Sequence, residues 1–300
     1  MEKIKSGFIS IIGRPNVGKS TLLNSLLEKK VSIITPKAQT TRNRINGILN
    51  KPDCQYVFVD TPGVHKAKNE LDRFMNKTAI QSTKGVDAIL FLAPSNEFIG
   101  ENDQFILNAL KERDVPTFLV ITKSDLVSKE QLQAKIEEWN RQEFKFAKTI
   151  SISATMGENL IDLLDEIKNV LPETGIKFYP DDQYTDQPDR FIIREIIREE
   201  ILLQTEQEIP HSVAILIDKF EENTHIIKVI ASIICERNSQ KGIIIGNKGS
   251  KIKQIGIKSR EKLEILFANK FYLELFVKVK DKWRNSASLI KQLGYDTDTY

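Results

Sequence analysis

Eight residues near the N-terminus have the composition and spacing of a phosphate-binding loop. The segment reads Gly13-Arg14-Pro15-Asn16-Val17-Gly18-Lys19-Ser20, follows an apolar run and begins a helical pattern. In such a loop, backbone N–H groups and the positive end of the helix dipole bind phosphate oxygens. We expect Lys19 to reach the β and γ phosphates and Ser20 to bind Mg²⁺. The loop alone does not distinguish ATP from GTP, or a kinase from a hydrolase.

A second motif, Asp60-Thr61-Pro62-Gly63, follows the apolar run at residues 56–59. Ligands of a parallel sheet bind beyond the carboxyl ends of its strands, so this motif is expected beside the phosphate loop. There the Asp60 carboxylate is placed to help hold Mg²⁺, and the Gly63 N–H is placed to sense a γ phosphate. The alternative is an ordinary surface turn.

Two later strand ends carry residues suited to a nucleotide base. Thr122-Lys123-Ser124-Asp125 follows the run 118–121, and Ser153-Ala154 follows the last run of this region. The Asp125 carboxylate is able to accept hydrogen bonds from N1 and N2 of guanine, while the Lys123 stem covers the ring. Adenine would leave that carboxylate unpaired, at a cost in a desolvated pocket. With a backbone N–H of Ser153-Ala154 donating to guanine O6, the motifs favour guanine.

The four motifs, in this order, resemble the small GTPases related to translation factors over residues 7–171. The resemblance implies binding of GTP and GDP with Mg²⁺, and hydrolysis of GTP to GDP and phosphate. Thr122 stands where the family most often has Asn. Its hydroxyl remains but the amide is lost, so we expect base specificity to persist with less local bracing. A metabolic P-loop kinase that prefers ATP is the alternative, and Asp125 argues against it.

The residue that follows Gly63 bears on hydrolysis. Many GTPases have a Gln there that orients the attacking water, but this chain has Val64, followed by His65. His65 is a candidate base, but the sequence favours the alternative that it is a solvated loop histidine. Related GTPases that combine an Asn in the phosphate loop with an apolar residue in place of Gln use a bound K⁺. The resemblance therefore implies K⁺ held by Asn16, the carbonyls of residues 35–37 and phosphate, with slow turnover. The alternative is that Asn16 only braces the loop.

A polar segment, Gln39-Thr40-Thr41-Arg42-Asn43-Arg44, lies where such proteins have a mobile switch. A threonine hydroxyl there binds Mg²⁺ only while the γ phosphate is present, and hydrolysis loosens the loop. By alignment with the family pattern we favour Thr41 over Thr40. The alternative is a polar loop that merely begins a strand.

A third glycine motif, Gly246-Asn247-Lys248-Gly249, lies in the C-terminal third of the chain. It matches the GXXG loop of KH-type RNA modules, which lets a nucleic-acid backbone approach closely and clamps about four nucleotides. The basic residues around it support RNA binding, and the apolar ones are candidates for a groove, although most isoleucines are expected in the core. The alternative is a solvated lysine-rich helix on a protein-binding domain. The basic residues are Lys241, Lys248, Lys251, Lys253, Lys258, Arg260 and Lys262, and the groove candidates are Ile244, Ile245 and Ile252.

The elements that must position these motifs follow from the hydrophobic pattern. From residue 7 to about 171, short apolar runs alternate with helical patterns, which predicts an α/β domain with a mostly parallel sheet. The expected strands are 8–12, 45–49, 56–59, 89–92, 118–121 and 149–152, and the expected helices are 20–27, 71–83, 103–113, 129–143 and 160–171.

A polar, proline-punctuated stretch after Leu171 predicts a linker. Beyond it, a helix over 191–206, strand patterns near 213–217, 226–234 and 273–279, a glycine-interrupted segment at 241–249 and a helix over 251–267 predict a smaller α+β domain. We therefore expect a GTPase domain at 1–172, a linker at 173–190, a type II KH domain at 191–285 and a tail at 286–300.

The composition is that of an ordinary globular chain. Its 300 residues include 44 Lys and Arg against 41 Asp and Glu, a net charge of +3, so any nucleic-acid binding must come from a local cluster. Only Cys54 and Cys235 are present, which excludes a disulfide framework and a cysteine zinc site. No apolar run approaches the ~20 residues that span a bilayer, and a reducing cytoplasm is expected.

Over nearly its whole length, the chain resembles the Era family of bacterial ribosome-assembly GTPases. The segment 278–284 and the Gly294-Tyr295 pair fit the same family. The resemblance implies a monomer that binds the 3′ end of 16S ribosomal RNA during maturation of the 30S subunit, with GTP controlling that affinity, and peripheral association with the inner face of the cell membrane. The alternative is a constitutive RNA-binding KH protein whose nucleotide site only stabilises the fold.

Overall fold

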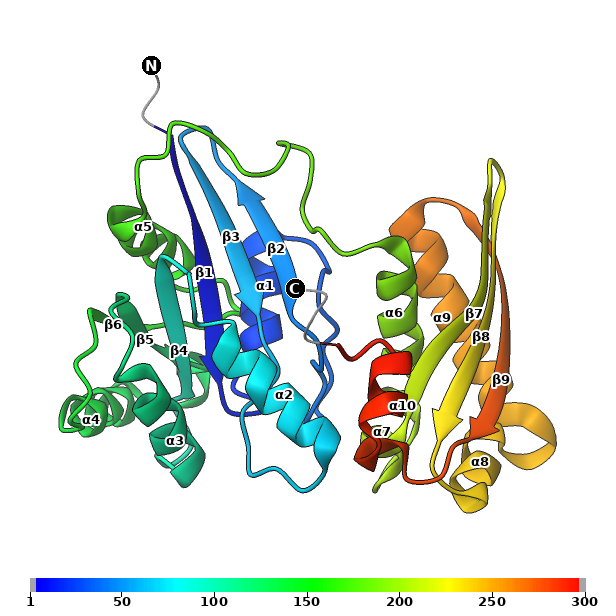
Figure 1. The fold of residues 1–300 in the computed structure, drawn as a ribbon. Helices are drawn as coiled ribbons and strands as arrows, with labels where there is room; N and C mark the ends of the chain where they lie inside the picture. Colours follow the sequence, from blue (N-terminus) through cyan, green and yellow to red (C-terminus); the bar gives the residue numbers. More distant parts are fainter. Residues whose placement is uncertain (1–3, 297–300) are drawn as a thin grey trace. The chain divides into compact units, whose positions relative to one another are not determined.

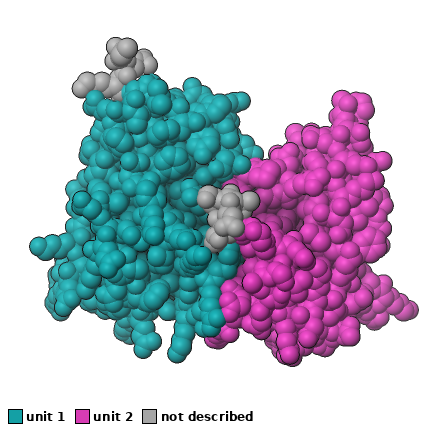
Figure 2. Space-filling model, viewed as in Figure 1, with its two compact units in different colours: residues 1–32, 41–67, 72–186 teal, residues 33–40, 68–71, 187–300 magenta. Residues whose placement is uncertain are grey.

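The structure, a computed structural model, describes residues 4–296, and the chain divides into two compact units. Unit 1 comprises residues 1–32, 41–67 and 72–186, and unit 2 comprises residues 33–40, 68–71 and 187–300 (Figure 2). The short stretches 33–40 and 68–71 therefore belong to the C-terminal unit, although the chain on either side of them belongs to unit 1. None of the helices within residues 4–296 is long and apolar enough to cross a bilayer.

Unit 1 is built on a six-stranded sheet with the strand order β2-β3-β1-β4-β5-β6 (Figure 1). All neighbouring strands are parallel except β2, which pairs antiparallel with β3 at the edge. Strands β3, β4 and β5 are buried at every residue, as expected for strands covered on both faces. The strands are β1 Lys5–Gly13, β2 Ile45–Asn50, β3 Cys54–Asp60, β4 Ala88–Pro94, β5 Thr117–Thr122 and β6 Lys148–Ser151.

Helices cover both faces of this sheet. Alternate residues of β4 show the division: Leu90 and Leu92 join one apolar core with α1 and α5, whereas Ile89 and Phe91 join another with α2, α3 and α4. This alternation follows from the two-residue period of a strand. The helices are α1 Lys19–Leu27, α2 Glu70–Gln81, α3 Glu101–Leu110, α4 Lys129–Asn140 and α5 Leu160–Val170, with a 3₁₀ turn η1 at Ser124–Leu126. The predicted α/β class is confirmed.

Much of the predicted linker, 173–190, packs within unit 1. Residues up to Asp186 belong to that unit, where the backbone N–H of Ile48 donates to the Tyr184 carbonyl at 2.9 Å. The Gln55 side-chain oxygen accepts from the N–H groups of Phe178 and Tyr179 at 2.7 and 3.0 Å. The segment thus supplies partners to the edge strand β2 and to a buried amide.

Unit 2 contains a three-stranded sheet in the order β7-β8-β9, in which β7 and β8 are antiparallel and β8 and β9 are parallel. Helices α6 and α9 pack on one face of it around an isoleucine-rich core (Figure 1). The main elements are α6 Asp189–Gln204, α7 Ile209–Ser212, β7 Ala214–Asn223, β8 Ile226–Cys235, α8 Asn238–Ile245, α9 Ser250–Phe267 and β9 Lys270–Val279.

Two segments of unit 2 for which the sequence predicts no particular secondary structure contain helices. Residues 241–245 form the C-terminal part of helix α8, with Gly242 inside it. The predicted tail contains a helix, α10 Ala287–Gln292, and Tyr295 is buried with its ring stacked on Trp283 at 6.1 Å. This stacking holds the segment against the unit. Residues 297–300 of the predicted tail lie outside the described part of the chain.

Candidate nucleotide-binding and RNA-binding sites

The phosphate loop links the end of β1 to the start of α1, and its lysine is buried. Lys19 Nζ donates to the carbonyls of Gly13 at 3.2 Å and Arg14 at 2.8 Å. Burial lowers the pKa of Lys19 to about 8, and the Asp60 charge opposes that shift only in part. Gly18 has a φ of 99°, a left-handed conformation that glycine adopts without strain. The ammonium group is therefore held inside the curve of the loop.

Four oxygen-bearing side chains meet at the end of β3. Asp60 Oδ2 accepts from Ser20 Oγ at 2.8 Å, from Ser32 Oγ at 2.9 Å and from Thr41 Oγ1 at 3.4 Å. The hydroxyls of Ser20 and Thr41 lie 2.8 Å apart. Burial raises the pKa of Asp60, with the Lys19 charge acting in the opposite direction. The structure thus brings together the three residues that the sequence assigns to the metal and adds Ser32, which sequence reasoning missed.

The chemistry of this cluster fits a hard divalent cation. Within the described residues, Asp60 Oδ1 is buried and has no hydrogen-bond partner. A carboxylate and two hydroxyl oxygens are ligands that Mg²⁺ accepts alongside phosphate oxygens and water. An orphaned buried oxygen is costly unless it meets a donor or a cation. The residues Ser20, Thr41 and Asp60 are therefore suited to hold Mg²⁺.

The turn after β3 places its residues in different surroundings. A Cβ on Gly63 would lie 2.7 Å from Pro15 backbone atoms, so glycine is required for the turn to lie against the phosphate loop. Thr61 Oγ1 donates to the Ile11 carbonyl at 2.7 Å. The Val64 side chain is fully buried in the core below α2 and α3, and only its N–H faces the loop, donating to the Gly13 carbonyl at 3.2 Å. The side chain of Val64 thus does not line the phosphate surface.

His65 is held by neighbouring groups of unit 1. Its Nδ1 lies 3.0 Å from the Gly63 carbonyl oxygen, and its Nε2 lies 3.5 Å from Asp72 Oδ1. Asn76 braces the same residue, accepting from its N–H at 3.2 Å and donating to its carbonyl at 2.6 Å. Both ring nitrogens therefore face oxygen atoms of the protein, which favours a structural role over that of a base.

The Arg14 side chain is directed at helix α3. Its Nε lies 2.9 Å from the buried carboxylate of Asp103, and its Nη2 donates to the Phe98 carbonyl at 3.2 Å. Burial raises the pKa of Asp103, and Arg14 is among the groups that oppose this shift. Arg14 therefore contributes its backbone to the loop while its guanidinium anchors the loop to α3. Asp103 carries no sequence signal beyond its place near a helix start.

The residues expected to read the base are connected to the phosphate loop and to one another. Thr122 Oγ1 donates to the Val17 carbonyl at 2.7 Å, so the hydroxyl braces the phosphate loop. The Ser124 N–H donates to the Ile152 carbonyl at 3.1 Å. Ser25 of α1 donates to the Ala154 carbonyl at 2.7 Å. These bonds bring the third and fourth motifs together at one edge of the sheet.

The residues at this edge differ in their exposure. Asp125 is exposed, Ser153 is buried, and Ala154 is partly buried. Lys123 has a left-handed backbone with φ 58°, and its Nζ lies 3.5 Å from Glu97. Ser95, which sequence reasoning missed, fixes this conformation by donating to the Lys123 carbonyl at 2.7 Å.

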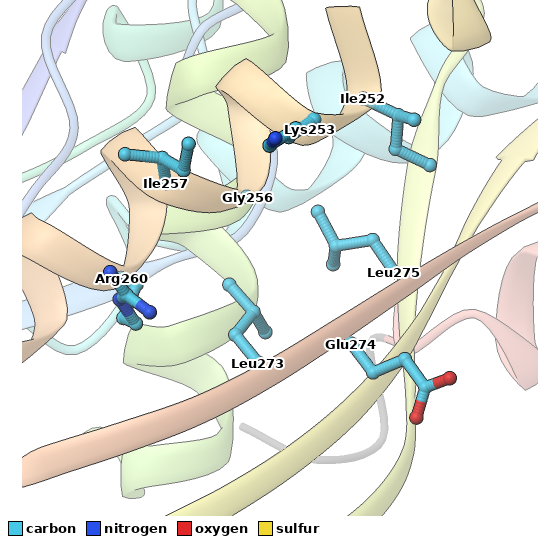
Figure 3. Close-up of a pocket in the computed structure, with 8 residues that line it drawn as sticks. All are labelled: Ile252, Lys253, Gly256, Ile257, Arg260, Leu273, Glu274 and Leu275. Atoms are coloured by element: carbon cyan, nitrogen blue, oxygen red, sulfur yellow. The ribbon is translucent and has the colours of Figure 1, made fainter. Parts of the chain in front are cut away.

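In unit 2, a groove of about 310 Å³ lies between α9 and β9 (Figure 3). Leu273 and Leu275 point toward the helix, whereas the Glu274 carboxylate points away from it. Ile252, Gly256 and Ile257 complete an apolar lining, and the cationic side chains of Lys253 and Arg260 are exposed at its margin. Of the isoleucines proposed for the groove, Ile252 lines it, Ile245 is partly buried, and Ile244 is fully buried in the core.

The GXXG motif connects α8 to α9. Gly246 has a φ of 73°, and a Cβ there would lie 2.7 Å from the Lys251 Cβ. Gly249 has a φ of 78°, and a Cβ there would meet no atom within 4 Å. Asn247 and Lys248 are exposed, and Lys241, Lys251 and Lys253 flank the loop on α8 and α9. Gly246 thus permits the tight loop, and Gly249 presents bare backbone to the surroundings.

These features define a P-loop protein joined in one chain to a KH domain. Family profiles agree: one described as a 50S ribosome-binding GTPase matches residues 8–123, and one described as a KH domain matches residues 208–284. A solved structure of Era in complex with MgGDPNP and nucleotides 1506–1542 of 16S ribosomal RNA is 38% identical, covers 97% of this chain and 99% of that chain, and has a TM-score of 0.94. A variant of Era from Aquifex aeolicus bound to GDP and AlF₄⁻ is also 38% identical with the same coverage and a TM-score of 0.93. The chain belongs to the Era family of GTPases.

Proposed function

We propose that the protein is a GTP-hydrolysing switch that binds the 3′ end of 16S ribosomal RNA through its KH domain and assists assembly of the 30S subunit. The observation that carries this proposal is the combination, in one chain, of the Asp60 cluster beside the phosphate loop and a GXXG loop beside an apolar groove with cationic margins. The relative solved with MgGDPNP and 16S ribosomal RNA nucleotides supports it.

In the nucleotide site, each group has a role that follows from its position. Lys19 neutralises the β and γ phosphates, and the Gly63 N–H donates to the γ phosphate. Ser20, Thr41 and Asp60 hold Mg²⁺, which supplies charge compensation on the phosphates when bound. Asp125 and Lys123 read guanine, with Ser153 and Ala154 at its O6. Since Thr41 lies in the predicted switch, its binding to Mg²⁺ depends on the presence of the γ phosphate.

Hydrolysis in this protein proceeds without a glutamine, because Val64 occupies that place and its side chain lies in the core. We propose that K⁺ fulfils the electrostatic role, with Asn16 as a protein ligand and the carbonyls of residues 35–37 as further candidates. Asn16 is exposed and has a left-handed backbone at φ 62° within the phosphate loop.

Replacing K⁺ by Na⁺ is expected to slow GTP turnover at least about tenfold, since a smaller, differently coordinated ion stabilises the developing charge less well. Turnover is measured as phosphate release at matched ionic strength. The Asn16→Ala variant serves as the comparison, because its rate should be nearly the same in the two salts. Equal rates in K⁺ and Na⁺ for the unaltered protein would remove the K⁺ proposal.

In the RNA site, the apolar floor of the groove packs on bases, and Gly246, Asn247, Lys248 and Gly249 approach the RNA backbone. Lys241, Lys251 and Lys253 attract its phosphates. The same basic surface attracts anionic lipid headgroups, which supports peripheral membrane contact of a cytoplasmic monomer.

The switch is tested by measuring affinity for a single-stranded RNA of the 16S 3′-end sequence with GDP and with a nonhydrolysable GTP analogue bound. We expect the two dissociation constants to differ at least about fivefold, the lower range of allosteric coupling. A scrambled RNA of equal length is the control for charge. Equal constants in the two nucleotide states would instead indicate a constitutive RNA-binding protein with a structural nucleotide site.

A further inference from the structure

The segment 33–40, which contains part of the predicted switch, is attached to helix α6 of unit 2. The Ile33 side chain is buried in the core of that unit. The Ile34 N–H donates to Glu199 Oε1 at 3.2 Å, and the Thr40 carbonyl accepts from the Arg198 guanidinium. Arg198 is fully buried and is paired with Glu195 one turn earlier. Both ends of the segment are thus held by α6.

The residues immediately outside this segment belong to the magnesium cluster of unit 1. Ser32 and Thr41 both donate to Asp60 Oδ2, at 2.9 and 3.4 Å. One peptide bond separates Ser32 from Ile33, and one separates Thr40 from Thr41. A displacement of Thr41 on loss of the γ phosphate therefore acts directly on the backbone that α6 holds.

Glu199 connects this segment to the helix that carries the RNA groove. Its Oε1 accepts from Ile34, while its Oε2 accepts from Lys262 Nζ of α9 at 2.7 Å. Lys262 also lies 2.5 Å from Glu200, and both carboxylates are nearly fully buried. Burial alone would lower the pKa of Lys262, but the two glutamates outweigh it and hold the pKa above its usual value. Lys262 is therefore charged and attaches α9 to α6 through its ion pairs with Glu199 and Glu200.

We propose that Glu199 is a positioning residue through which the switch segment 33–40 adjusts helix α9 and thereby the RNA groove. Hydrogen bonds in a buried network polarise one another, so a change at one oxygen of a carboxylate alters the hydrogen bond made by its other oxygen. When the Ile34 N–H moves, Glu199 reorients and shifts the position of Lys262. The α9 residues that line the groove, Ile252 to Arg260, lie within three turns of that lysine. This inference rests on the proposed switch function.

The test compares the full-length protein with Glu199→Gln and Glu200→Gln. Glu199→Gln keeps a hydrogen-bond acceptor for the Ile34 N–H but loses the charge that holds Lys262. Glu200→Gln weakens the ion pair with Lys262 without altering a contact of Ile34. Affinity for the 16S 3′-end RNA is measured with GDP and with the nonhydrolysable GTP analogue. We expect the ratio of the two dissociation constants to fall from at least about fivefold to below about twofold in Glu199→Gln, and to persist in Glu200→Gln.

Each other outcome contradicts the proposal. If Glu199→Gln keeps the ratio of dissociation constants of the unaltered protein, Glu199 has no role in the coupling. Equal weakening in both nucleotide states shows a structural role only. Loss of the ratio in Glu200→Gln as well assigns the effect to the lysine's charge balance and not to Glu199. A ratio near one in the unaltered protein refutes the switch function itself, which separates that failure from failure of the Glu199 assignment.

A second variant keeps the test decisive if Glu199→Gln does not fold. Lys262→Met removes the other end of the same connection from α9 while retaining the apolar stem. We expect the ratio of its two dissociation constants to fall below about twofold. A folded Lys262→Met protein, judged by its melting transition, that keeps the full ratio overturns the proposal.

Discussion

Replacing Asp125 by Asn is expected to weaken GDP binding at least about a hundredfold and to make xanthosine diphosphate the preferred ligand. Two hydrogen bonds to a charged carboxylate contribute roughly 1.5–3 kcal/mol each, so losing both corresponds to about 10²–10⁴ in affinity. Xanthine has an oxygen where guanine has its N2 amine. The amide introduced by Asp125→Asn would donate to that oxygen and accept from N1–H, which restores both bonds. Titration calorimetry with the two diphosphates measures the exchange.

Asp114→Asn is a matched control for this experiment. It removes a carboxylate from the loop before β5, at the opposite end of the strand from Asp125, and should leave both affinities unchanged. Unaltered GDP binding in Asp125→Asn would show that this carboxylate does not read the base. Displacement of bound GTP by excess ATP from the unaltered protein would favour the kinase alternative.

Replacing Gly249 by Asp is expected to weaken binding of the 16S 3′-end RNA at least about a hundredfold while leaving GTP hydrolysis unchanged. The space around this glycine is open to a nucleic-acid backbone. A carboxylate within ~4 Å of a phosphate costs about 4 kcal/mol at the dielectric of a protein surface, which is nearly a thousandfold. Asp tolerates the left-handed conformation at φ 78° better than most residues, so the loop should fold. Fluorescence anisotropy of labelled RNA provides the measurement.

Asn247→Asp separates backbone approach from charge alone. It introduces the same carboxylate two residues earlier, at an exposed position of the same loop. We expect a smaller loss there, about tenfold, because Asn247 already carries a side chain of the same size, so Asn247→Asp adds charge without filling the open space that Gly249 leaves. RNA binding retained by Gly249→Asp would contradict the KH assignment, and equal losses in the two variants would attribute the effect to charge alone.

The chemistry of the nucleotide site could be predicted from local sequence because each group lies at a strand end within a short motif. Lys19, Ser20 and Asp60 meet as expected from the common edge of a parallel sheet. Other parts depend on partners distant in the chain. Nothing in the sequence near Ser32 indicates its bond to Asp60, and Arg14 follows the loop pattern although its guanidinium pairs with Asp103.

The burial of the Val64 side chain also could not be predicted from the sequence. The sequence shows that no glutamine is present, but the two faces of a turn cannot be distinguished without the residues packed against it. In the folded protein, the Val64 side chain joins the core and only its N–H faces the loop. The lining of the groove beside α9 could not be predicted for the same reason. Ile244 and Ile252 differ little in sequence context, yet only Ile252 lines the groove.

The order of the motifs was enough to identify a guanine-nucleotide site and a GXXG loop, because both depend on glycines and polar groups at fixed short spacing. Tertiary structure alone assigned residues 33–40 to the C-terminal unit and buried the charged residues of α6. Nothing in the sequence distinguishes the charged run Arg198-Glu199-Glu200 from helix residues that face water. Whether such charges face water or one another depends on which helix and which loop pack against them, because burial of a charge is favourable only where partners converge from distant parts of the chain.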